Sequence, residues 1–532
     1  MARRRLVVWL GLMLAASAAT VAFLALRQPE PEPARAPNVL IVLWDTVRAD
    51  RLSVYGYDRP TTPRLEAFAE DATVYEHAWS PGIWTLAAHS SVFTGLPVES
   101  TGSDERWLWL DHGHYTLAEH FSDHGYDTFS FSANALLAPD TNLVQGFRVV
   151  FNTWQGRIRE LARRATLAKV LPEDRSNELA PGWTPPDHGA TNAEWAKAEF
   201  KDAAPVIAEG FLRWLDRRPD PDQPFLAYLN MMEAHTPRIP SMEARKAVIG
   251  DEELIRRGLE VDAGHINLHF YNFGQHEYSS EDLEAINAVY DATLRDLDDA
   301  TADLFARLDE RGILDDTIVI LTSDHGENLG DHHLFNHRFV LWETLLHVPL
   351  IIRYPDGLAP GREQRPVSTM DLYATLCDLT GLPVPEGQRG TSLRSDERGP
   401  PVAFMSMPLE REIRTVQNIY PDVDIAPWLR SGHATVMNGH KLIDWHQAPD
   451  ELYDLRSDPG ERTNIFNGTA HGVSALRQRL TAWRDAAPVY DPDSRGPLDQ
   501  PKNVRASQKD LMNQLEALGY VTEEPADEPE SE

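Results

Sequence analysis

Three residues with metal-binding side chains come shortly after apolar runs of the sequence. Asp45 follows the run 39–43, and Asp324 and His325 follow the run 317–321. Two carboxylates and an imidazole suit Zn²⁺ or Mn²⁺ better than the all-oxygen cage that Ca²⁺ prefers, although Ca²⁺ is compatible with them too. We therefore expect one divalent metal ion, Zn²⁺, Mn²⁺ or Ca²⁺, at these three residues.

The hydroxyl group of Thr85 is a candidate fourth ligand. Residues 84–95 (WTLAAHSSVFTG) predict a short helix that ends at Gly95, with Thr85 at or near its N-cap. The free N–H groups and the positive end of the helix favour an anion at that point. The simpler alternative is that Thr85 only caps the helix.

An α/β sheet would bring these residues together. The apolar runs 39–43, 225–231 and 317–321 are typical of strands covered on both faces, and helix-like segments alternate with them, the longest from about Ser279 to Gly312. Open α/β sheets bind ligands at the carboxyl ends of their strands. We therefore expect one site to contain the polar residues that follow the strands, namely Asp45, Glu233, His235, Asp324 and His325.

The composition excludes several classes of protein. The 532 residues are 42% hydrophobic and 25% charged, which is typical of a globular protein and not of a disordered, collagen-like or multi-span membrane chain. Fifty Lys and Arg against 82 Asp and Glu give a formal net charge of −32. Such an acidic surface repels polyanions, so no nucleic-acid partner is expected. The single Cys377 excludes an intramolecular disulfide.

The N-terminus predicts export. Three arginines at 3–5 precede the uncharged run 6–26, which is long enough to cross a bilayer as a helix with the arginines on the cytoplasmic side. A cleaved signal peptide with the site Ala16-Ser17-Ala18 fits almost as well. In both cases the rest of the chain lies on the periplasmic or extracellular side, anchored to the membrane if the segment is uncleaved.

Several motifs resemble those of the sulfatase family, which belongs to the alkaline phosphatase superfamily. The run 37–52 (PNVLIVLWDTVRADRL) resembles the opening of the family, and 323–332 (SDHGENLGDH), 348–352 (VPLII) and 451–455 (ELYDL) follow in the family's order. With smaller matching pieces, the resemblance spans about residues 37–520.

The resemblance implies an alkaline phosphatase/sulfatase-like α/β fold. A large mixed, mostly parallel sheet flanked by helices is joined by a small C-terminal subdomain with an antiparallel sheet. We divide the chain into a signal peptide or anchor (1–27), a linker (28–36), the catalytic domain (37–399), the C-terminal subdomain (400–485) and an extension with an acidic tail (486–532).

The resemblance also implies roles for single residues. Asp45, Asp324 and His325 bind the metal, and His235 lies beside the ester. His337 falls where members carry a lysine or histidine next to the substrate.

The departures from the family pattern point to a particular branch. Counting back from Thr94-Gly95 places Thr85 where sulfatases carry the cysteine or serine that becomes formylglycine, and His89 where they carry an arginine. Trp44 replaces the first of the two paired metal-binding aspartates that family members carry. Asn134 lies where a lysine and a histidine are missing. Threonine cannot become formylglycine, so the set resembles the threonine-dependent branch, which includes phosphodiesterases, lipoteichoic acid synthases and phosphoethanolamine transferases.

We interpret the chain as an exported, metal-dependent hydrolase of a sulfate or phosphate ester or diester. The metal would lower the pKa of the Thr85 hydroxyl, so that an alkoxide attacks phosphorus and water or an alcohol opens the phosphothreonine. His235, His337 and Asn134 would neutralise charge on the ester, one histidine would protonate the leaving group, and His89 completes the expected catalytic set.

The expected partner is an anionic ester, with a glycan or a lipid headgroup as its alcohol part. Two alternatives to hydrolysis stay open. The chain could transfer a headgroup to a glycan or lipid acceptor, or it could be a catalytically silent glycan-binding protein.

Overall fold

The computed structural model describes residues 35–104, 107–169, 200–408, 410–467, 473–487 and 490. The chain divides into two units, Met1–Pro37 and Asn38–Glu532. The predicted signal or anchor segment 1–27 and nearly all of the predicted extension 486–532 lie outside the described residues. Among the helices of the described ranges, none combines the length and the apolarity that a membrane crossing requires.

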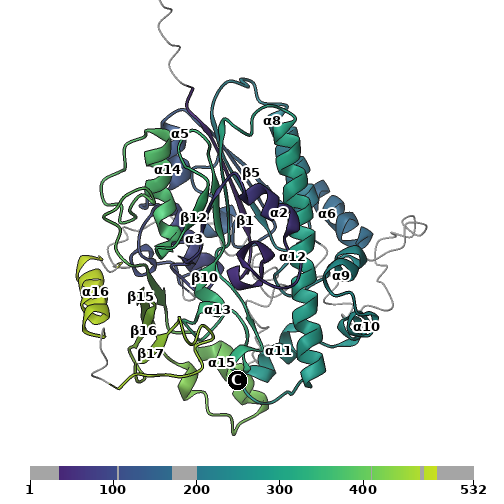
Figure 1. Ribbon diagram of the computed structural model, residues 1–532, viewed down its shortest axis with the longest axis vertical. Coiled ribbons are helices and arrows are strands. Elements are labelled where there is room, and N and C mark those ends of the chain that lie inside the picture. The colour runs from purple at the N-terminus through teal and green to yellow at the C-terminus, as the bar shows by residue number, and fades with distance from the viewer. Residues whose placement is uncertain are drawn as a thin grey trace, which may run out of the picture. The chain divides into compact units, whose positions relative to one another are not determined.

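A mixed eight-stranded sheet forms the centre of the larger unit (Figure 1). Its strand order is β12-β2-β11-β7-β1-β6-β4-β5. The strands are β1 (Asn38–Trp44), β2 (Thr73–Tyr75), β4 (Asp127–Ser132), β5 (Val149–Asn152), β6 (Phe225–Met231), β7 (Thr317–Thr322), β11 (Leu350–Arg353) and β12 (Gly361–Glu363).

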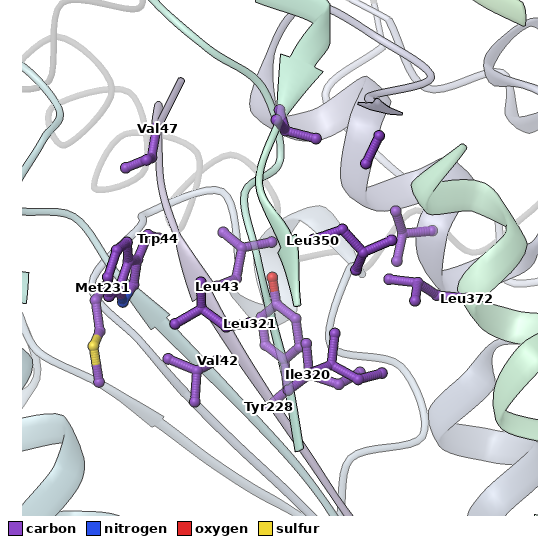
Figure 2. Close-up of a cluster of buried hydrophobic side chains, with 14 of the residues drawn as sticks. Val42, Leu43, Trp44, Val47, Tyr228, Met231, Ile320, Leu321, Leu350 and Leu372 are labelled. Carbon is purple, nitrogen blue, oxygen red and sulfur yellow. The ribbon is translucent and has the colours of Figure 1, made fainter. Parts of the chain in front are cut away.

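The three apolar runs of the sequence form the middle of this sheet, as predicted. Strand β1 pairs in parallel with β6 on one side and with β7 on the other. All residues of these three strands are buried, because helices cover both faces of the sheet. Figure 2 shows Val42 and Leu43 of β1 packed with Ile320 and Leu321 of β7. The antiparallel strand β11 then extends the sheet beyond β7.

Helices lie on both sides of the sheet, with α12, α8 and α2 on one side in Figure 1 and α3, α5 and α14 on the other. The helices are α2 (Pro63–Ala69), α3 (Thr85–Thr94), α4 (Val98–Thr101), α5 (Leu117–Asp123), α6 (Gly156–Ala168), α8 (Ala204–Leu215), α9 (Met242–Val248), α10 (Glu252–Glu260), α11 (His265–Asn272), α12 (Ser280–Asp309), α13 (Glu343–Leu346), α14 (Leu372–Thr380), α15 (Glu410–Ile419) and α16 (Val473–Ala486).

Local signals define the ends of the longest helix, α12. Ser279 is its N-cap and forms a capping box with Asp282, as the spacing in the sequence predicts. The helix ends at Asp309, and Gly312 follows with a φ of 66°, a conformation that glycine adopts without steric cost.

A second, antiparallel sheet confirms the predicted C-terminal layer. Its order is β14 (Val402–Met405), β15 (Gly432–Met437), β16 (His440–Trp445) and β17 (Glu451–Asp454). Helix α16 packs on it through Leu476 and Leu480. Lys441 of β16 is fully buried, and its Nζ lies 3.0 Å from Glu343 of α13 and 2.8 Å from Glu461.

Short elements complete the fold. The remaining strands are β3 (Ala78–Trp79), β8 (Asn328–Leu329), β9 (Phe335–Asn336), β10 (His347–Val348) and β13 (Val367–Ser368), and the 3₁₀ helices are η1 (Ala49–Arg51), η2 (Ser53–Tyr55), η3 (Pro139–Thr141), η5 (Asp331–His333), η6 (Thr369–Asp371) and η7 (Ala426–Trp428).

Candidate active site and metal centre

The carboxyl ends of the central parallel strands bring the predicted metal ligands together. Asp45 follows β1 directly, and Asp324 and His325 lie just beyond the end of β7. One potential ligand atom from each of the three residues lies within 4.8 Å of the others, and all three side chains are buried. The convergence that the strand ends predict is therefore present.

In each carboxylate of this group, hydrogen bonds hold one oxygen, and the other oxygen has no hydrogen-bond partner among the described residues. Asp45 Oδ2 accepts hydrogen bonds from the amides of Asn134 at 2.8 Å and Asn230 at 3.0 Å. Asp324 Oδ1 accepts two backbone N–H groups at 3.0 and 3.2 Å. Asp45 Oδ1 and Asp324 Oδ2 are buried without a hydrogen-bond partner among the described residues. Buried oxygens of this kind are costly unless a cation or another donor binds them, so the group fits a metal ion.

The imidazole of His325 is also oriented to bind a metal ion. Its Nδ1 lies 2.9 Å from the carbonyl oxygen of Gly326, which can only accept, so Nδ1 carries the proton. The other nitrogen, Nε2, then has a free lone pair and lies 3.4 Å from Asp324 Oδ2. Burial also lowers the pKa of His325, which favours the neutral form that binds metals.

Burial raises the pKa of both carboxyls of this group. Burial, followed by the charge of Asp324, raises the pKa of Asp45 to about 7. Burial likewise raises the pKa of Asp324 to about 7. A divalent cation between them would restore the ionised form of both carboxyls.

The hydroxyl group of Thr85 reaches the ligand group. Thr85 is the first residue of α3 and is buried, while the N-cap position belongs to Trp84. Thr85 Oγ1 lies 3.4 Å from His325 Nε2 and 3.3 Å from Asn134 Nδ2, and the Thr85 side chain lowers the pKa of Asp324. A capping role alone therefore does not account for the position of the Thr85 hydroxyl.

Asn230 belongs to the site although the sequence analysis did not select it. Its Oδ1 accepts hydrogen bonds from Ser132 Oγ at 3.0 Å and from the Asn134 backbone N–H at 3.2 Å. This fixes the amide with its nitrogen toward Asp45. The available signal was an asparagine inside the otherwise apolar strand FLAYLNM, where a buried amide needs partners.

His89 supports the first turn of α3. Its Nδ1 lies 2.8 Å from the carbonyl oxygen of Thr85, and its Nε2 lies 2.6 Å from the hydroxyl of Tyr228. The carbonyl must accept, so Nδ1–H donates to it and the Tyr228 hydroxyl donates to Nε2. Burial lowers the pKa of His89 to about 3, so the ring is neutral. The predicted catalytic role of His89 stays a prediction, and this geometry favours a supporting role.

His235 and His337 lie together beside the metal ligands. Their ring centroids are 5.4 Å apart, and the ring of His337 lies 4.4 Å from that of His325. His337 Nδ1 is 3.2 Å from Glu327 Oε1, and Glu327 Oε2 accepts from Arg238 at 2.7 Å. Both histidines thus lie close to the potential metal ligands, and their ester-binding role stays a prediction. Glu327 and Arg238 are additions from the structure.

Glu233 follows a central strand but faces away from this group. Its Oε1 accepts the backbone N–H of Ala204 at 2.7 Å and lies 3.7 Å from Lys169 Nζ. The expectation that Glu233 joins the site is therefore wrong. The carboxylate instead satisfies the first turn of α8.

Trp44 also lies outside the ligand group. Its indole donates a hydrogen bond to Thr301 of α12 at 3.0 Å, and Figure 2 shows it beside Met231 in the core. Successive side chains of a strand point to opposite faces, so Trp44 and Asp45 diverge. The indole of Trp44 thus packs in the core, while the carboxylate of Asp45 belongs to the ligand group.

Comparison with known proteins is consistent with this architecture. The sulfatase family model matches residues 37–382, and the model for the C-terminal part of N-sulphoglucosamine sulphohydrolase matches residues 330–486. Arylsulfatase K of Bos taurus is 25% identical over 476 residues, which is 84% of this chain and 81% of that protein. Choline-sulfatase of Rhizobium meliloti is 23% identical over 478 residues, 84% of this chain and 86% of that protein.

A solved structure supports the same fold. The phosphonate monoester hydrolase of Agrobacterium radiobacter superimposes with a TM-score of 0.63 at 21% identity, covering 85% of this chain and 96% of that one. The family model covers well over half of the sequence, and the sheet, the C-terminal layer and the buried ligand group agree with it. The chain belongs to the sulfatase family of hydrolases.

Proposed function

We propose that the chain cleaves a phosphoryl or sulfuryl ester in two steps, with Thr85 as the nucleophile and one divalent metal ion held by Asp45, Asp324 and His325. One observation carries the proposal. Thr85 Oγ1 lies 3.4 Å from His325 Nε2 and 3.3 Å from Asn134 Nδ2, in the buried group that also contains the carboxylate oxygens Asp45 Oδ1 and Asp324 Oδ2, which have no hydrogen-bond partner among the described residues.

The side chains around Thr85 support a displacement at the ester. Bound at this site, a divalent cation supplies positive charge that lowers the pKa of a neighbouring hydroxyl and polarises the ester. Thr85 Oγ1 gives its proton to a neutral histidine of the neighbouring pair, His235 or His337, and forms a bond to phosphorus or sulfur while the bond to the leaving oxygen breaks. The amide of Asn134, 3.3 Å from Thr85 Oγ1, is placed to donate to the developing negative charge.

The histidine pair next to the ligands completes the cycle. His235 or His337 gives a proton to the leaving oxygen, and water then opens the bond between Thr85 and the transferred group. Phosphoryl esters fit this route best. A formylglycine hydrate expels sulfate by elimination, and a threonine adduct has no such exit, so water must attack the transferred atom itself.

Relatives support the choice of ester class. Arylsulfatase K and choline-sulfatase are named for sulfate esters, and the structural relative is named for phosphonate monoesters. We include phosphate diesters and phosphonate monoesters as the first substrates to test. We also propose that segment 1–27 exports the chain, which a reporter fusion read on each side of the membrane would test.

The experiment compares three chromogenic esters of one phenol. The purified chain, supplied with Zn²⁺, Mn²⁺ or Ca²⁺, is assayed on a phosphodiester, a phosphonate monoester and a sulfate ester, with Thr85→Ala and Thr85→Ser beside the wild type. We expect phosphoryl cleavage that Thr85→Ala lowers by about 1,000-fold or more, with partial activity in Thr85→Ser. Cleavage that survives in Thr85→Ala would show that another group is the nucleophile.

The same assay separates the enzyme from a silent binding protein. A well-folded chain that contains no metal, takes up none on addition and cleaves no ester would refute the proposal. Product analysis with added alcohols would reveal a transferase, because the transferred group would then appear on the alcohol.

A further inference from the structure

A buried series of charged groups leads from Arg238 through Glu327 to His337. The side chains of Arg238, Glu327 and His337 are 5%, 1% and 8% exposed. Glu327 Oε2 accepts from Arg238 Nη2 at 2.7 Å, and Glu327 Oε1 lies 3.2 Å from His337 Nδ1. Nothing in the proposed displacement uses Glu327 directly.

We infer that Glu327 is a positioning residue that fixes His337 in the tautomer with its proton on Nδ1 and so presents Nε2 to the ester. The inference deepens the proposed function and rests on it for the identity of the ester. A carboxylate oxygen only accepts hydrogen bonds, so the nitrogen that faces it must donate. The lone pair of the imidazole is then on Nε2, at the opposite edge of the ring.

Arg238 prevents Glu327 from rotating out of this arrangement. Its Nε donates to the carbonyl oxygen of Ala234 at 2.8 Å, and its guanidinium lies over the ring of Tyr290 at 5.1 Å. A guanidinium donates through every nitrogen, so the Glu327 oxygen that faces it must accept. The orientation of both carboxylate oxygens is thereby set.

This arrangement predicts an unusual effect of an isosteric change. In Glu327→Gln, the amide oxygen must face Arg238, so the amide NH₂ faces His337 Nδ1. Nδ1 then has to accept, and the proton moves to Nε2. Nε2, the nitrogen that faces the ester, then carries the proton and has no lone pair to accept one. The same change of tautomer follows when the carboxylate that orients a catalytic histidine is replaced by an amide.

Glu327→Asp gives the opposite expectation. The aspartate side chain is one methylene shorter, so it fills the site less well than glutamine does, but it keeps two acceptor oxygens. A residue needed only for packing would tolerate glutamine better than aspartate. A residue that fixes the tautomer would tolerate aspartate better than glutamine.

The test uses Glu327→Gln and Glu327→Asp in the metal-supplemented full chain, with the exposed Glu253→Gln as the matched control. We expect Glu327→Gln to lower kcat by about 100-fold or more with KM changed less than about threefold. Glu327→Asp should stay within about tenfold of the wild type, and Glu253→Gln should be unchanged. The inference would be overturned if Glu327→Gln had the same kcat as the wild type, or a higher kcat than Glu327→Asp.

NMR spectroscopy can determine the tautomer of His337 even if the chain cleaves no ester. In the ¹⁵N-histidine-labelled chain, with the His337 signals identified by their loss in His337→Gln, we expect a proton on Nδ1 in the wild type and on Nε2 in Glu327→Gln. The same tautomer in both would refute the inference. Failure of the wild type to cleave any ester would refute only the proposed function, because the spectrum is read independently.

Discussion

Metal binding to this chain should release protons in an amount that depends steeply on pH. Before metal binds, burial raises the pKa of Asp45 and of Asp324 to about 7, with the charge of Asp324 as a second cause for Asp45, while an unfolded aspartate titrates near 3.8. The raised values mean that the metal-free fold favours the protonated carboxyls, and that its stability falls as the pH rises from about 4 to about 7. A bound divalent cation requires both carboxyls ionised.

The magnitude follows from these two values. With both pKa values near 7, metal binding releases about 1.8 protons near pH 6, about one near pH 7 and about 0.2 near pH 8. Each carboxyl weakens the apparent affinity about tenfold between pH 8 and pH 6, so the two together weaken it about 100-fold. His325 releases fewer protons than an ordinary histidine would, because burial lowers its pKa.

Calorimetry measures both quantities. The chain is stripped with a chelator and titrated with Zn²⁺ or Mn²⁺ at pH 6, 7 and 8, in pairs of buffers with different ionisation enthalpies. Asp45→Asn is the matched control, because it removes one of the two titrating groups and should reduce the affinity change to about tenfold. An affinity that changes less than about threefold between pH 6 and pH 8 in the wild type would refute the reasoning.

Two further substitutions test the groups around the site. Asn230→Ala removes one of the two amides that orient Asp45, so metal affinity measured in the same titration should fall by about 10- to 100-fold, and an unchanged affinity would contradict the orienting role. Lys441→Met removes the buried cation shared by Glu343 and the buried Glu461, so denaturant unfolding should show a loss of about 3–5 kcal/mol, against no change in the exposed Lys246→Met. A Lys441→Met chain as stable as the wild type would show that the buried pair contributes nothing net.

Local patterns allowed much of the fold to be predicted. The apolar runs that became β1, β6 and β7 are short and continuous, and the capping residues of α12 lie only three positions apart in the sequence. The group of potential metal ligands was predictable for a related reason, since Asp45, Asp324 and His325 lie close to the ends of strands that pair in parallel.

The residues that were missed depend on contacts between distant segments. Asn230 matters because β6 lies between β1 and β4, which no local pattern around Asn230 reveals. Glu327 is part of a quoted motif, but its role appears only when Arg238, 89 positions away, meets it. Glu233 was misassigned because its position after a strand does not fix the direction of its side chain.

The hydrogen bonds to the two aspartates also limit the denticity of the site. Two amides occupy one oxygen of Asp45, and two backbone N–H groups occupy one oxygen of Asp324, so each carboxylate has a single oxygen to give. With His325 Nε2 and Thr85 Oγ1, the described side chains offer four donor atoms. Four donors satisfy a tetrahedral ion, whereas an ion that takes six to eight oxygens would have to complete its shell with water and with the substrate itself. Such an ion would bind more tightly with the ester than without it.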